Sequence, residues 1–457
     1  MADNLLDKAS ILLTPTAYND GSMLSVKPEN GDGDFTFSRG SAATRVNAQG
    51  LVENVQIISS ELVSNGDFSQ GEQDWTLGIG WSVDQANSKA VATSSTSGQS
   101  VGQSSVASSL SNGSLAQVSF QVLDITQGSF GIYFSGTLVG SLNSVGTFNG
   151  TFIKGTETTF YIRALGTTSG SISNISVKEI TDDTDLPRID YTDGCGSWLL
   201  EPQSTNLYLN SETLSTQSNA TSASTYTVSF YGTGTITFSG THTGTLVGTG
   251  ANDRVSATFT TTSGTLTSTV SGDCTKGQLE NLSYATSYIL TDAAIATRLA
   301  DVANNSGNST LINSTEGVLY AEIAALANDG TVRAIYISNG TASNRLWVEF
   351  DSVANRFETR YIVNGITSAN FFHIVSEITN FNKIAFKWKE NDFSLYVNGI
   401  EVANDTSGSV INADTLNRID FHNQSSASVQ NFYGKVKALA VYKEALTDAQ
   451  LQSLTTI

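Results

Sequence analysis

An alternation of apolar and polar residues with a period of two constrains the fold of this chain more than any other feature. In the C-terminal third it recurs at Leu319/Ala321/Ile323, Ile384/Phe386/Trp388 and Phe393/Leu395/Val397. Lys383, Lys387 and Lys389 stand between or beside the apolar positions of the second run. Successive side chains of a β-strand point to opposite faces, so these runs predict a sheet with one buried face and one face in water.

Turn and helix signals divide these runs. Glu390–Asp392 separates two of them as a hairpin turn, and Asn398-Gly399 is a pair that tight hairpin turns favour. Near the end of the chain, Thr447 is placed to cap a short helix over Asp448–Leu454. Residues 302–457 are therefore predicted to form one β-sandwich that ends in a short helix.

Two further regions, residues 61–180 and 207–290, alternate in the same way between turns rich in glycine. The clearest examples are Val118/Phe120/Val122, Phe130/Ile132/Phe134, Tyr226–Phe230 and Val255–Phe259. Short strands with regularly spaced turns are typical of antiparallel sandwiches. The sequence predicts an all-β protein built from several antiparallel β-sandwich (jelly-roll) domains in series.

The segment Leu186–Leu207 (LPRIDYTDGCGSWLLEPQSTNL) separates two of these modules. It holds two of the chain's four prolines, and proline interrupts regular strand pairing. Between the prolines, Arg188–Tyr191 and Trp198–Glu201 have the pattern of short extended segments joined by an Asp-Gly turn. We interpret the segment as a junction.

This junction resembles a segment in tail-fibre and other virion surface proteins of tailed bacteriophages. In those proteins a second motif follows, which this chain supplies as Gln278–Glu280, Tyr284–Ile289 and Arg298–Asp301. The run Asp32–Glu53 (DGDFTFSRGSAATRVNAQGLVE) resembles their opening motif. The resemblance implies a position on the virion surface, assembly in the host cytoplasm, and other virion proteins as partners.

Two modules resemble known jelly rolls. The stretch that begins at Ser64 (SNGDFSQGEQDWTLGIGW) is similar to the start of xylanase-associated carbohydrate-binding modules. Its Trp75 and Trp81 are suited to stacking on sugars, but tryptophans at the start of a sandwich belong more often to the core, which is our expectation. The closing segment FYGKVKALAVYKEALTDAQLQSL resembles the laminin-G/concanavalin A-like jelly roll. That fold commonly binds glycans or proteins, sometimes through calcium, although a fold alone establishes neither.

The chain is expected to have four parts. They are residues 1–60, an N-terminal arm that attaches to the virion; residues 61–180, a jelly roll like a carbohydrate-binding module; residues 181–301, the junction plus a small β-sandwich; and residues 302–457, a concanavalin A/laminin-G-like sandwich.

The arm has apolar patches at Ile11–Leu13 and Phe35–Phe37 but too little regular pattern to bury them alone. The junction and its echo at Gln278–Asp301 are also short strands with open edges. Packing of identical chains would cover such patches and edges. We therefore expect a homotrimer that is held through the arm and the junction, with the C-terminal sandwich pointing outward.

Charge excludes several kinds of partner. The chain has 23 Lys and Arg against 42 Asp and Glu, a net charge of −19, which repels phosphate backbones and anionic lipids, so no nucleic-acid partner is expected. No apolar run approaches the ~18 residues of a membrane span, so no membrane insertion is expected, and the start of the chain lacks a signal-peptide pattern. Cys195 and Cys274 are expected as thiols, although a single bridge between them stays open.

No metal or cofactor site is predicted. His242, His373 and His422 stand in separate segments, so a zinc ion lacks its usual ligands. Asp32 and Asp34 begin like a calcium loop, but the ligand pattern does not continue, and we interpret them as turn residues.

No catalytic residue is predicted either. Gly98–Gly102 (GQSVG) matches the nucleophile-elbow pattern, but its flanks are polar and poor in helix formers. Concanavalin A-like glycosidases typically place acids as E-x-D-x-x-E on one strand, and Glu349-Phe-Asp351 is the nearest approach here. The C-terminal region has several acids that could act in glycoside cleavage, but the sequence does not show which of them form a pair: Glu322, Glu349, Glu358, Asp392 and Asp420. We expect no enzyme activity, and the sequence assigns no ligand-binding residue.

The sequence therefore favours a tail or head fibre, or another adhesin of a tailed-phage virion, that holds host-surface glycan or protein. Several shallow sites, repeated over subunits and copies, would supply avidity without tight single contacts. Two alternatives remain: a polysaccharide depolymerase, and an architectural subunit that decorates a capsid or tail.

Overall fold

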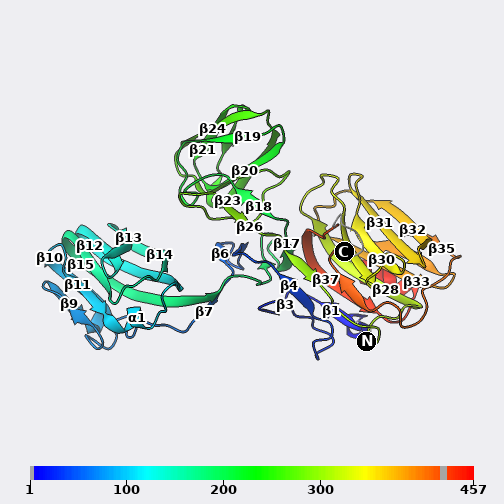
Figure 1. Cartoon of the computed structure of the whole chain (residues 1–457), viewed down its shortest axis with the longest axis horizontal. Coiled ribbons are helices and arrows are strands. Elements are labelled where there is room, and N and C mark those ends of the chain that lie inside the picture. The colour runs from blue at the N-terminus through cyan, green and yellow to red at the C-terminus, as the bar shows by residue number, and fades with distance from the viewer. Residues whose placement is uncertain (1–4, 423–429) are drawn as a thin grey trace. The chain divides into compact units, whose positions relative to one another are not determined.

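The computed structural model describes residues 5–422 and 430–457, and it confirms the all-β prediction (Figure 1). Strands hold 51% of the residues and helices 4%. The chain divides into two compact units. The first unit consists of Met1–Val55 together with Thr184–Ile457, and the second unit is Gln56–Asp183. The second unit is thus inserted into the sequence of the first.

The second unit is a nine-stranded antiparallel sheet with its own core. Its elements are β7 (Ile57–Ile58), β8 (Thr76–Leu77), β9 (Trp81–Asp84), η2 (Gln85–Asn87), β10 (Lys89–Ser95), β11 (Ser100–Gln103), α1 (Ser104–Ser108), β12 (Leu115–Phe134), β13 (Thr137–Leu142), β14 (Gly146–Ile153) and β15 (Phe160–Asp182). The long strands β12 and β15 pair with repeated register shifts, and such bulges bend a sheet. Trp75 and Trp81 are buried in this core, as predicted.

The first unit contains the C-terminal sandwich, in which an eight-stranded and a five-stranded sheet share one core. The larger sheet consists of β1 (Ile11–Leu13), β16 (Ile189–Asp190), β17 (Ser197–Leu200), β28 (Glu316–Ala325), β33 (Asn382–Lys389), β34 (Phe393–Val397), β35 (Ile400–Asp405) and β37 (Gly434–Tyr442). The smaller sheet consists of β29 (Arg333–Ser338), β30 (Arg345–Phe350), β31 (Arg356–Val363), β32 (Ile366–Ile374) and β36 (Arg418–Asp420).

The N-terminal arm belongs to this sandwich. Strand β37 pairs on one edge with β28, and on its other edge first with β17 and then with β1, where Ile11 lies opposite Val441. Both apolar patches of the arm contribute to the main core, through Ile11, Phe35 and Phe37. The expectation that neighbouring chains must cover these patches is therefore wrong. Strand β37 covers Ile11–Leu13 through pairing across more than four hundred residues, and the strand that holds Phe35–Phe37 pairs with Val302–Asn304 of the same chain.

The water-facing side expected for the larger sheet is also buried. Tyr320, Ala385 and Tyr396 lie on that side and are at most 3% exposed. Helix α2 (Asp448–Thr455) packs over them through Leu451. Lys387 is buried there as well, and its Nζ lies 2.6 Å from Asp392 Oδ1. The prediction of one wet face is wrong for Tyr320, Ala385, Tyr396 and Lys387, which are buried, whereas Lys389 at the end of β33 is exposed as expected.

Residues 207–290 form the small sandwich, with its own core. Its sheets contain β20 (Thr225–Gly232), β23 (Gly250–Thr260) and β25 (Thr275–Glu280) on one side, and β19 (Gln217–Thr221), β21 (Thr235–Gly240), β22 (Gly244–Val247) and β24 (Gly264–Ser271) on the other. The remaining elements of the first unit are η1 (Leu5–Lys8), β2 (Tyr18–Asn19), β3 (Ser22–Met23), β4 (Phe35–Ser38), β5 (Thr44–Val46), β6 (Val52–Asn54), β18 (Ser204–Asn206), β26 (Ala296–Arg298) and β27 (Val302–Asn304). Cys274 is buried in the small sandwich, Cys195 is exposed, and both are free thiols.

Several local predictions are confirmed. Thr447 caps α2 through a capping box with Gln450. The Asp-Gly turn connects β16 to β17, because Gly194 N donates to Tyr191 O at 2.8 Å. Asn398 and Gly399 both have positive φ, as a tight turn between β34 and β35 requires.

Candidate functional site

The phage-like motifs meet in a buried ion network, which consists of Arg39, Arg188, Arg298, Glu201 and Asp301. Arg39 Nη1 lies 3.0 Å from Asp301 Oδ1, and Arg188 Nη1 lies 2.6 Å from Glu201 Oε2. Arg188 Nη2 also pairs with Asp301, and Arg298 Nη1 lies 3.3 Å from Glu201 Oε2. All five side chains are at most 3% exposed. The network joins the arm, the junction and the segment that leaves the small sandwich.

Charge and hydrogen bonds together stabilise the ionised form of this network. Burial alone would raise the pKa of Glu201, but Arg298, Arg188 and two bonds from Ser287 hold that pKa at about 2. Burial lowers the pKa of Arg39 to about 10, still far above neutrality. Neighbouring motif residues are satisfied internally too, since Asn206 Nδ2 donates to Gly277 O and Ile289 O at 2.9 and 2.8 Å. The ion network therefore forms the structural centre of the first unit.

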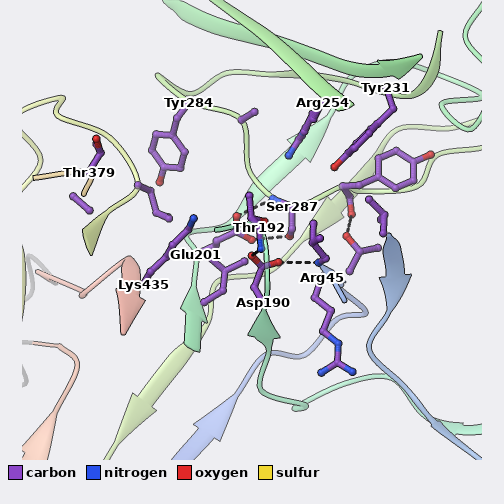
Figure 2. A pocket seen from close by; sticks show the side chains of 18 residues that line it. Arg45, Asp190, Thr192, Glu201, Tyr231, Arg254, Tyr284, Ser287, Thr379 and Lys435 are labelled. Atoms are coloured by element: carbon purple, nitrogen blue, oxygen red, sulfur yellow. Dashed lines mark hydrogen bonds between the residues drawn. The ribbon is translucent and has the colours of Figure 1, made fainter. Parts of the chain in front are cut away.

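A cavity of about 270 Å³ lies beside this network (Figure 2). Strand β5, the junction, the small sandwich and the ends of β28 and β37 contribute to its wall. Its polar lining residues are Thr44, Arg45, Asp190, Thr192, Glu201, Tyr231, Arg254, Tyr284, Ser287, Tyr288, Thr379 and Lys435. In Figure 2, Arg254 and Tyr231 extend toward Thr192 and Ser287, whereas the guanidinium of Arg45 points away from them.

Most charged groups of the cavity wall have partners within the chain. Arg45 Nε lies 2.8 Å from Glu53 Oε1, and Lys435 Nζ lies 2.6 Å from Asp193 Oδ2. Asp190 accepts hydrogen bonds from the backbone N–H groups of Val46 and Thr192 at 2.8 and 3.0 Å.

The outer side of the five-stranded sheet, called the sheet face below, carries a second group of functional side chains. Strand pairing aligns Tyr336, Trp347 and Arg360 in one row across β29, β30 and β31. The guanidiniums of Arg345 and Arg360 lie 4.9 and 5.2 Å from the centre of the Trp347 indole. Such contacts between a guanidinium and a ring are attractive.

The second row of the sheet face contains an acid pair. Glu349 lies directly opposite Glu358, which in turn lies opposite Phe372. Burial, followed by a hydrogen bond and repulsion from Glu358, raises the pKa of Glu349 to about 8. Arg360 forms an ion pair with Glu358. Glu349 therefore keeps its proton at neutral pH.

Phe372 makes the sheet face accessible at its β32 edge. Its side chain is 46% exposed, and the guanidinium of Arg356 lies 4.7 Å from its ring centre. Trp347 and Tyr336, in contrast, are only 5% and 3% exposed.

The structure shows where the residues singled out from the sequence lie. Ser100 of the GQSVG segment lies within β11 opposite Arg163, in regular strand pairing rather than at an elbow. In the described part of the chain, no group of three or more His, Cys, Asp or Glu side chains is placed to hold a metal ion. Asp34 accepts bonds from Ser25 N and Oγ at 2.7 and 2.9 Å, as a turn residue does. Among the acid candidates, the structure brings Glu349 and Glu358 together.

Residues 306–452 match the family model described as "Concanavalin A-like lectin/glucanases superfamily". The C-terminal sandwich is concanavalin A-like. The match covers less than half of the chain. A search of curated proteins gave no match. Within residues 5–422 and 430–457, no helix combines the length and apolar character needed to cross a membrane.

Solved structures give distant likenesses. The carbohydrate-binding module CBM40 of the Ruminococcus gnavus IT-sialidase, bound to α2,3-sialyllactose, is 16% identical over 33% of this chain and 86% of that chain, with a TM-score of 0.29. A SAP-like pentraxin of Limulus polyphemus is 14% identical over 32% of this chain and 71% of that chain, with a TM-score of 0.27. The NanB sialidase of Streptococcus pneumoniae (K499G mutant) is 15% identical over 33% of this chain and 26% of that chain, with a TM-score of 0.27.

Proposed function

We propose that this protein is a fibre or adhesin on the virion surface of a tailed bacteriophage, on its tail or head, and that it holds host-surface glycan. The phage-like motifs support the virion location. The lectin-like fold of the C-terminal sandwich supports glycan as the ligand.

The observation that carries the ligand proposal is the sheet face. Sugars present apolar C–H faces that stack on aromatic rings and hydroxyl groups that bond to charged side chains. Phe372 offers an exposed ring, and Arg356 and Arg360, both partly exposed, offer donors beside it. A shallow site of this kind would bind weakly, so we also propose a homotrimer that gains avidity from repeated sites.

We further propose that the sheet face binds glycan without cleaving it. Retaining glycosidases hold their two carboxyl groups about 5–5.5 Å apart, and inverting enzymes hold them about 6.5–9.5 Å apart. Glu349 and Glu358 instead lie directly opposite each other on neighbouring strands, close enough for Glu358 to raise the pKa of Glu349. Incubation with host capsule or envelope glycan should therefore release no reducing ends, and release that disappears in Glu349→Gln would contradict the proposal.

A glycan array tests the binding proposal with the full-length chain. Phe372→Ala should reduce the signal of each bound glycan at least tenfold, because the stacking ring is lost. Ile400→Ala is the matched control, since Ile400 is 65% exposed on β35 of the other sheet. Absence of any bound glycan, or equal loss in both variants, would refute the proposal. Antibody labelling of intact particles tests the virion location, and light scattering should give about three times 48.3 kDa.

A further inference from the structure

The cavity of Figure 2 contains one guanidinium, that of Arg254, for which the described residues supply no ion-pair partner. Arg254 lies on β23 of the small sandwich and is half-buried. Its Nη2 donates to Ser229 Oγ at 2.7 Å, and its Cζ lies 5.9 Å from the centre of the Tyr231 ring. Among residues 5–422 and 430–457 it forms no ion pair, and its buried Nε has no hydrogen-bond partner. A positive charge in this position favours an anionic ligand.

The other positive groups of the wall differ from Arg254 in this respect. Arg45 is paired with Glu53, and Lys435 is paired with Asp193. A ligand with one negative charge would therefore match the cavity, whereas a phosphate group would bring nearly two charges to a single available guanidinium. A carboxylate is the better fit, because its two oxygens suit the planar fork of arginine.

Hydroxyl groups and one carboxylate line the same cavity as this guanidinium. The hydroxyls of Tyr231, Thr192 and Thr379 line the cavity and make no hydrogen bond to any residue that the structure describes. Asp190 is buried, and each of its oxygens keeps a lone pair beyond its backbone bond. This set complements a ligand that carries several hydroxyl groups besides its carboxylate.

We propose that the cavity binds one acidic sugar unit of the hexuronate class, with its carboxylate on Arg254 and its hydroxyls on Tyr231, Thr192, Thr379 and Asp190. Its volume of about 270 Å³ lies just below the ~300–1,000 Å³ of sites for drug-sized ligands, so it suits a single ring. The identification of the ligand as part of a glycan rests on the proposed function. The site itself is separate from the sheet face, since the two share no residue.

Calorimetric titration of the full-length chain with sodium D-glucuronate tests this site. We expect saturable binding that weakens with added salt, and binding of uncharged D-glucose at least tenfold weaker. Arg254→Gln should weaken glucuronate binding at least tenfold, and Tyr231→Phe should weaken it severalfold by removing one hydroxyl. Arg163→Gln is the matched control, because Arg163 lies over the Tyr133 ring at 5.6 Å but does not line the cavity.

The outcomes separate this inference from the proposed function. Phe372→Ala should leave glucuronate binding unchanged, so failure of one site does not imply failure of the other. Circular dichroism checks that Arg254→Gln is folded. If that variant does not fold, the glucuronate affinity of Tyr231→Phe tests the site instead. No saturable binding of glucuronate, equal binding of glucose, or equal effects of Arg254→Gln and Arg163→Gln would each overturn the proposal.

Discussion

Replacement of Asp301 by asparagine should destabilise the first unit strongly. Asp301 is fully buried and accepts from Arg39, Arg188 and the backbone N–H of Glu201. In Asp301→Asn the network keeps three guanidiniums but loses one of its two carboxylates, and the new amide group directs donors at neighbouring donors. Breaking a buried ion pair by removing one partner costs about 3–5 kcal/mol, and the shared position of Asp301 places the expected cost in this range.

Denaturant titration followed by circular dichroism measures this cost. The two units have separate cores, so they should unfold in separate transitions, and only the transition of the first unit should shift. Asp193→Asn is the matched control, because Asp193 pairs with Lys435 near the same junction but its side chain is 40% exposed. Surface pairs contribute about 0–1 kcal/mol. If the free energy of unfolding of Asp301→Asn were within about 1 kcal/mol of the wild-type value, or equal to that of Asp193→Asn, the network would not hold the first unit together.

Three further changes test the structure. The raised pKa of Glu349 means that the folded state binds a proton more tightly than the unfolded state, so the free energy of unfolding should fall as the pH rises from 4.5 to 8. Glu349→Gln should remove this loss. In urea titrations above pH 8, this variant should be more stable than the wild type by on the order of 2 kcal/mol. Thr447→Ala should cost about 1 kcal/mol in the same assay, because α2 loses its cap. Exposed Cys195 should react quickly with a thiol reagent, whereas Cys274 should react when its sandwich unfolds.

The fold could be predicted where the evidence was local. Alternation at Leu319, Ala321 and Ile323 determined a strand, and Thr447 determined where the last helix begins. The pairing of Ile11 with Val441 could not be predicted, because nothing near either residue specifies so distant a partner. The burial of Tyr320 was missed for a related reason, since periodicity within one strand does not reveal a helix that covers it.

The candidate site shows the same division. The motifs around Arg188, Glu201 and Asp301 were recognised, but their side chains were not recognised as one network. A signal was present in the sequence, because arginines and acids within these motifs stand out in a chain with few charges. The pairing of Glu349 with Glu358 depends on the register between β30 and β31, which alternation does not determine. Arg254 was missed because its significance comes from its having no ion pair among the described residues, and partners for such pairs come from other strands.

The insertion of the second unit leads to a last prediction, that residues 56–183 can be removed without unfolding the first unit. Val55 N donates to Ala43 O and Asp185 N donates to Arg39 O, so both cut ends lie beside one short segment of the arm. Four residues span at most about 14 Å, and about eight Gly/Ser residues have an end-to-end distance of roughly 16 Å, enough to join the ends. The shortened chain should keep a cooperative unfolding transition and its glucuronate binding, because every residue that lines the cavity remains. Deletion of residues 1–40 should abolish that transition instead, because it removes Ile11 and Arg39. If the chain without residues 56–183 aggregated while the chain without residues 1–40 stayed folded, then the inserted unit, and not the arm, would complete the sandwich.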